Sequence, residues 1–132
     1  MKQYAFNSAI AVGGSVVTFF VGAWSEMLTL LFTVIIIDYI TGLMSAIMNR
    51  NLSSSIGYKG LIKKFGIVLI VVLSFQIDKF MGTNFVMSGT ILFFVSNELI
   101  SIIENYGKIG LPLPPQITNV IKMLKDKNDK TL

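Results

Sequence analysis

The chain has 132 residues, of which 53% are hydrophobic and 14% are charged, with a formal net charge of +4. A soluble domain carries about 25% charged residues, so this composition excludes an ordinary soluble domain and predicts one membrane domain whose surface faces lipid. The sequence contains no cysteine and no histidine, which excludes disulfides, thiolate metal sites and the commonest general base. We therefore expect an all-α integral membrane protein that is not an enzyme and binds no metal or cofactor.

Four apolar stretches predict four membrane-spanning helices within a membrane domain of residues 1–110. The expected spans are about residues 3–25, 27–49, 61–79 and 83–103. About 20 helical residues cross the hydrocarbon core, which is about 30 Å thick. Lys2 precedes the first stretch, as in a signal peptide, but the apolar part is too long and further spans follow at once. We therefore expect an uncleaved helix.

Small residues four positions apart line one side of the first span. Gly14, Thr18 and Gly22 form a flat strip on which another helix can approach closely. Two interpretations stay open, which are packing against the protein's own helices and self-association between copies. Such strips are common in membrane bundles, so the spacing alone does not choose between them.

Asp38 lies at the midpoint of the second span, which is otherwise uncharged over residues 27–49. A carboxylate at this depth costs about 2.5–3.5 kcal/mol on insertion scales, so it should face protein, water or a partner. Thr41, Gly42 and Ser45 follow it on a small, polar side of the helix. Two interpretations of Asp38 stay open. It is part of a helix contact, in which it is protonated or bonded to a neighbouring hydroxyl. Alternatively, it is an acid that lines a pore or couples protons.

Basic residues gather around a polar loop expected at residues 51–60. We expect four basic side chains to lie at the membrane surface, beside the lipid headgroups: Arg50, Lys59, Lys63 and Lys64. The glycines of this segment do not have the spacing of a phosphate-binding loop. By the positive-inside rule the loop is cytoplasmic, and with four spans both termini are cytoplasmic as well. The positive charge thus predicts contact with the lipid bilayer and not with nucleic acid.

The end of the fourth span carries polar residues on two overlapping faces. Asn97, Ser101 and Glu104 share one face, and Glu98, Ser101 and Asn105 share another. The segment is either an interfacial helix end or a face that lines water or contacts another subunit.

Residues 111–132 are expected to form a cytoplasmic tail. Glycines and prolines at 107–115 should end the fourth helix. Apolar residues at positions 117, 120, 121 and 124 predict a short amphipathic helix over 116–124. The remaining polar end is expected to be disordered.

Four segments together resemble the toxin-secretion/phage-lysis holin family of Gram-positive phages and prophages. The segments are DYITG at 38–42, SSIGYKGLIKK at 54–64, NELISIIEN at 97–105 and GLPLP at 110–114. Their order and spacing match over nearly the whole chain from about residue 30 to 124. The motif positions are occupied by Asp38, Thr41, Gly42, Gly60, Lys64, Glu98, Ser101, Glu104 and Asn105.

The resemblance implies a protein of the host cytoplasmic membrane that homo-oligomerises into lesions at a set time. Such lesions let an endolysin reach the cell wall and collapse the membrane potential, and some relatives are implied to export toxins. The family implies no catalytic residues. Two alternatives remain, which are a small proton-coupled multidrug exporter that uses Asp38 and a passive subunit of a larger membrane complex.

Overall fold

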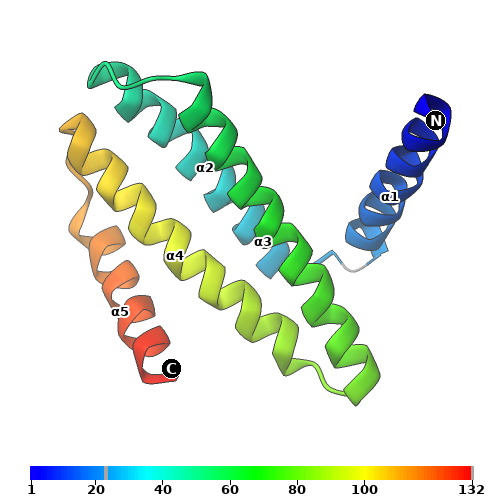
Figure 1. The fold of residues 1–132 in the computed structure, drawn as a ribbon. Helices are drawn as coiled ribbons and strands as arrows, with labels where there is room; N and C mark the ends of the chain where they lie inside the picture. Colours follow the sequence, from blue (N-terminus) through cyan, green and yellow to red (C-terminus); the bar gives the residue numbers. More distant parts are fainter. Residues whose placement is uncertain (23, 132) are drawn as a thin grey trace.

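The computed structural model describes residues 1–22 and 24–131, and all five helices in these residues are α-helices. In chain order they are α1 (Lys2–Gly22), α2 (Glu26–Met48), α3 (Ser54–Met81), α4 (Phe85–Ile109) and α5 (Pro115–Thr131). Figure 1 shows α2, α3 and α4 in a bundle, from which α1 projects away, while α5 returns beside α4. The all-helical class predicted from composition is therefore confirmed.

Within the described residues, α2, α3 and α4 are the three helices long and apolar enough to cross a membrane, by length and composition. Four spans are expected, and the first of them, residues 3–25, is not confirmed. The predicted span 3–25 corresponds to α1, which ends at Gly22, and residue 23 lies outside the described residues.

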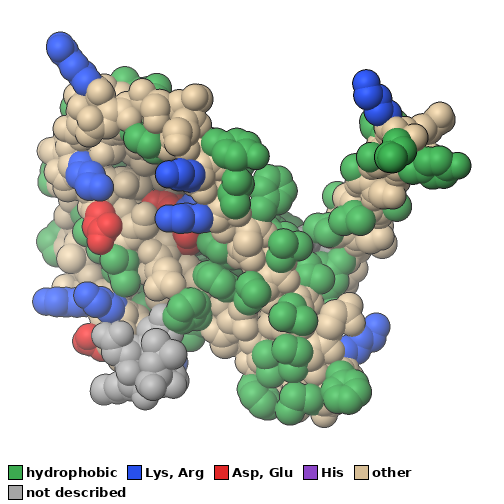
Figure 2. All heavy atoms as spheres, viewed as in Figure 1, with side chains coloured by type: hydrophobic (Ala, Val, Ile, Leu, Met, Phe, Trp, Pro, Cys, Tyr) green, Lys and Arg blue, Asp and Glu red, His purple; other side chains and the backbone are tan. Residues whose placement is uncertain are grey.

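The core is a narrow apolar stripe where the three helices of the bundle meet. Leu28 and Leu31 of α2, Val71 of α3 and Val95 of α4 are each at most 2% exposed. Within the apolar windows of these helices, only 33%, 17% and 28% of the residues are buried inside the protein. The remaining apolar side chains face outward (green in Figure 2), as expected for helices that lie in lipid.

Helix α3 begins earlier than predicted, so the expected loop at 51–60 is wrong over most of its length. The hydroxyl of Ser53 accepts a hydrogen bond from the backbone N–H of Ile56 at 3.2 Å. A serine in this position satisfies an N–H group that the first turn would leave unpaired. The polar, glycine-containing segment after it is therefore helical, and the connection to α2 is only a few residues long.

A second capping contact joins α3 to α4. The carboxylate of Asp78 accepts hydrogen bonds from the backbone N–H groups of Val86 at 3.0 Å and Met87 at 2.8 Å. It also accepts one from the hydroxyl of Thr83 at 2.6 Å. A negative side chain stabilises the positive end of the helix dipole, so Asp78 closes the turn between the two helices.

The small-residue strip of α1 does not pack against the rest of the described chain. No heavy atom outside the local helix lies within 4 Å of a Cβ built on Gly14 or Gly22. The contact of α1 with the bundle includes Phe19, whose ring meets that of Phe75 edge-on with centroids 4.7 Å apart. Packing of Gly14, Thr18 and Gly22 against the protein's own helices is therefore not observed.

The terminal helix α5 is longer than predicted. It runs over Pro115–Thr131 instead of 116–124, and the end expected to be disordered is helical as far as Thr131. After Pro115 the sequence contains no proline or glycine, so no residue in this stretch breaks the helix. Residue 132 lies outside the described residues.

Candidate functional site

One charged side chain from each helix of the bundle meets at a common point. Lys64 of α3 lies between Asp38 of α2 and Glu98 of α4. Its Nζ donates to Asp38 Oδ2 and, at 2.5 Å, to Glu98 Oε2. The lysine side chain is 16% exposed and each carboxylate side chain is 8% exposed. Two carboxylates thus share one ammonium group inside the bundle.

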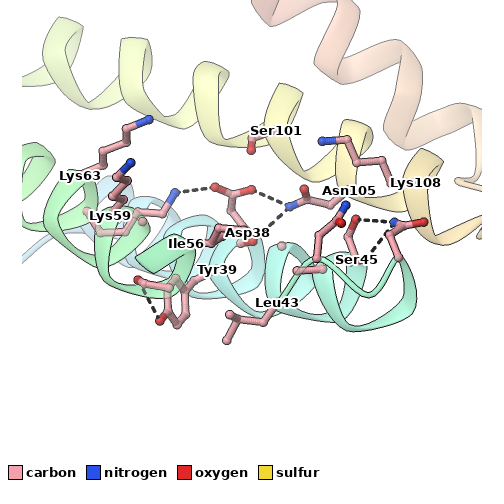
Figure 3. Close-up of a pocket in the computed structure, with 17 residues that line it drawn as sticks. Asp38, Tyr39, Leu43, Ser45, Ile56, Lys59, Lys63, Ser101, Asn105 and Lys108 are labelled. Atoms are coloured by element: carbon pink, nitrogen blue, oxygen red, sulfur yellow. Dashed lines mark hydrogen bonds and ion pairs between the residues drawn. The ribbon is translucent and has the colours of Figure 1, made fainter. Parts of the chain in front are cut away.

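Asn105 completes the surroundings of Asp38. Its Nδ2 donates to Asp38 Oδ1 at 2.9 Å and to the main-chain oxygen of Asp38 at 3.1 Å (Figure 3). The same nitrogen lies 2.9 Å from Thr41 Oγ1, and the Thr41 hydroxyl donates to the Ile37 carbonyl at 2.8 Å. Among the described residues, no buried side-chain nitrogen or oxygen lacks a hydrogen-bond partner. We call Asp38, Lys64, Glu98, Asn105 and Thr41 the ion cluster.

Glycines let the helices approach closely around this cluster. A Cβ on Gly42 would lie 3.6 Å from Nδ2 of Asn105, so α2 and α4 leave little room there for a larger side chain. On the other side of α2, the ring of Tyr39 packs on α3 at Gly57 and Gly60, where a built Cβ would lie 3.6 Å from its atoms. The Tyr39 hydroxyl also donates to the Gly57 carbonyl at 3.4 Å.

The ion cluster couples its three helices because each buried charge depends on partners from the other two. Removing one partner of a buried ion pair costs about 3–5 kcal/mol, since the remaining charge is left without a counter-ion. In lipid the isolated charges are also unfavourable, and ionisable groups in membrane spans therefore pair with one another or face water. The cluster can consequently either stay paired inside one chain or exchange its partners for water or for another copy.

The predicted polar residues separate into two groups. Asp38, Thr41 and Ser45 are buried in the bundle with at most 6% exposure, as is Glu98 on α4. Gly42 and Ser101 are partly buried beside them, whereas Asn97 and Glu104 are exposed. The sequence leaves two possible inward faces for α4. In the structure the face with Glu98, Ser101 and Asn105 lies toward α2. Asn97 and Glu104 face outward.

The expected position of Lys64 at the membrane surface is wrong, since its ammonium group lies inside the bundle. Arg50, Lys59 and Lys63 are exposed, and their position at the membrane surface stays a prediction. A sequence signal for Lys64 does exist. The buried residues of α3 are at positions 67, 71, 74 and 78, which are three or four residues apart and so lie on one face of the helix. Position 64 continues this spacing by one step toward the start of the helix.

The described residues contain no group of three or more acidic, histidine or cysteine side chains that could hold a metal ion. The cluster offers charge pairing, hydrogen bonding and proton exchange between two carboxylates and an ammonium group.

Comparison with known proteins identifies the family. Residues 15–126, which include all of α2, α3 and α4, match the bacteriophage holin family. The chain is 35% identical over 126 residues to an uncharacterized protein of Halalkalibacterium halodurans, covering 91% of this chain and 93% of the relative. It is 32% identical over 116 residues to an uncharacterized 14.9 kDa protein of Clostridium perfringens, covering 86% and 88%.

A phage relative carries a functional name. The chain is 35% identical over 106 residues to a probable holin of Bacillus phage phi105, covering 80% of this chain and 78% of that protein. No solved structure matches the chain. The apolar helices agree with the membrane location that this family implies. The chain belongs to the bacteriophage holin family.

Proposed function

We propose that the protein is a holin that homo-oligomerises in the bacterial cytoplasmic membrane. The resulting lesions release a cytoplasmic endolysin, or a toxin, and trigger lysis of the host. Family membership and the phage relative support this proposal. The structural observation that carries it is the ion cluster, because it keeps polar groups of three apolar helices out of lipid in a single chain.

The proposed transition exchanges the partners of these polar groups. In a single chain Asp38, Lys64 and Glu98 satisfy one another, and apolar side chains cover the outside. When many copies meet, the inward faces of α2 and α4 separate and come to line water. Water then replaces the lost contacts, so the polar groups are not exposed to hydrocarbon.

The proposed topology has four spans, with α1 as the first and both termini in the cytoplasm. The 21 residues of α1 are long enough to cross the hydrocarbon core. The turn between α2 and α3 and the start of α3 carry most of the basic residues that flank the spans. The positive-inside rule favours the cytoplasm for this end of the bundle.

Expression in a bacterial host tests the proposal. A host that also produces an endolysin without an export signal should grow normally, then lyse suddenly. Expression of the chain without the endolysin should arrest growth and admit a membrane-impermeant dye. Continued dye exclusion at high membrane levels would contradict the holin function. Drug resistance with an intact membrane potential would instead support the exporter.

A further inference from the structure

An open groove of about 630 Å³ lies at the end of the bundle where α2 ends and α3 begins. Its walls come from α2, α3 and α4, and the residues used below are Asn51, Lys59, Lys63 and Lys108. Figure 3 shows Lys59 and Lys63 on one side of Asp38 and Lys108 on the other. A volume of this size suits a small-molecule group.

Three of the lysines that line the groove are available for an anion. Lys64 is engaged by two carboxylates, those of Asp38 and Glu98, so it has no charge to offer an anion. Asp38 also lines the groove, so a bound anion has to lie at the lysines away from it. Within residues 1–22 and 24–131, no ion pair involves Lys59, Lys63 or Lys108. Lys59 and Lys63 are four residues apart and therefore lie on the same face of α3, where their repulsion is slightly unfavourable. A bound anion would remove this repulsion.

A second groove adjoins the first and differs in chemistry. It has a volume of about 520 Å³ and shares Asp38, Lys63, Lys64 and Ser101 with the first groove. Asn97 and Glu98 of α4 also line it. Its apolar part is lined by Gly66, Ile67 and Ile70 of α3 and by Phe94 of α4. From Lys63 to Ile70 the helix rises about 10 Å, so this part runs from the charged end toward the middle of the bundle.

We propose that the two adjoining grooves bind one anionic phospholipid. The phosphate lies among Lys59, Lys63 and Lys108, with the Asn51 amide at the rim, and one acyl chain follows Ile67, Ile70 and Phe94. Basic pockets between membrane helices are suited to anionic headgroups. The apolar groove favours a lipid over a free phosphate ion, because a free ion would leave it unused.

Competition between two lipids tests the site in the full-length protein. Membranes with equal amounts of phosphatidylglycerol and phosphatidylcholine are exchanged with the purified protein, and the retained lipid is counted by native mass spectrometry. The wild type should retain phosphatidylglycerol preferentially. The variant K59Q/K63Q/K108Q should reduce this preference about tenfold. The control K2Q/K122Q/K125Q removes the same charge from exposed positions outside the groove and should change the preference less than about twofold.

A separate variant tests the acyl-chain groove without changing charge. No heavy atom lies within 4 Å of a Cβ built on Gly66 or on Gly89. Gly66→Leu should fill the apolar groove and lower retention of both lipids, whereas Gly89→Leu, outside both grooves, should not. The proposal is overturned by the absence of a wild-type preference, by equal losses in variant and control, or by displacement of the lipid with millimolar inorganic phosphate. The last result would assign the charged groove to free phosphate.

Discussion

Two buried aspartates of the same bundle are satisfied in opposite ways. Asp78 accepts hydrogen bonds from Thr83, Val86 and Met87, all within nine residues of it along the chain. Asp38 is bound by Lys64 and Asn105, which are 26 and 67 residues away on other helices. The partners of Asp78 follow it across one short turn, so they stay near it when the helices move, whereas partners that are distant along the chain can be lost. Asp78 is therefore suited to maintaining a turn, and Asp38 to a contact that can be exchanged.

Replacement of Lys64, a partner of Asp38, should lower the stability of the bundle more than any other change considered below. Lys64→Met leaves Asp38 and Glu98 facing each other without the ammonium group. We expect the free energy of unfolding to fall by about 3–5 kcal/mol, measured by titration with a denaturing detergent. Lys122→Met, at an exposed residue outside both grooves, is the control and should change stability little. Equal stability of the two variants would show that the ion cluster does not hold the bundle together.

Replacement of Asp38 should change function more selectively. In Asp38→Leu, Lys64 keeps Glu98 as its partner, but Asn105 loses an acceptor. We expect the free energy of unfolding to fall by about 1–3 kcal/mol, with membrane insertion intact. Lysis should be delayed or abolished, as measured from culture turbidity at matched membrane levels. Unchanged lysis timing would exclude a role for Asp38 in the transition.

Enlarging Gly42 should separate α2 from α4 without removing a charge. A methyl group at this position fits at ordinary contact distance from Asn105, whereas a leucine side chain does not. We expect Gly42→Leu to destabilise the bundle by about 1–3 kcal/mol and Gly42→Ala to be tolerated. Crosslinking of cysteines introduced on the two helices would measure their separation. A tolerated leucine would contradict the close approach at this point.

Removal of the Asp78 carboxylate should have the smallest effect. Asp78→Ala leaves the first turn of α4 without its cap and should cost about 1 kcal/mol. Asp78→Asn retains a side-chain oxygen that can accept one of these hydrogen bonds, so its free energy of unfolding should fall by less. Lysis timing at matched membrane levels should be the same for both variants and the wild type. A delay as long as that of Asp38→Leu would remove the distinction between the two aspartates.

The helical class and the inward face of α2 were predictable because they depend on local patterns. Long apolar runs predict membrane helices, and an acid within one of them predicts a protected environment for Asp38. The partners of Asp38 depend on which helices pack together, and this information is not local. Both faces at the end of α4 are equally polar in the sequence, so only packing against α2 distinguishes Asn105 from Glu104.

Two errors have a common physical origin. Lysines and glycines next to a polar segment are typical of loops at the membrane surface, so residues 51–60 were expected to lie outside a helix. In the structure Ser53 caps the first turn of α3, and the glycines at 57 and 60 accommodate the Tyr39 ring. Lys64 was assigned to the surface for the same reason, although its spacing from the buried residues of α3 indicates the inward side.

The ion cluster also fixes how the helices can respond to bilayer thickness. Because Lys64 bonds to both α2 and α4, sliding α3 by one turn, about 5.4 Å, would separate it from both carboxylates. Hydrophobic mismatch must then be met by tilting all three helices together or by deforming the surrounding lipid. A single chain would thus respond to a thinner or thicker membrane as one unit until the cluster opens.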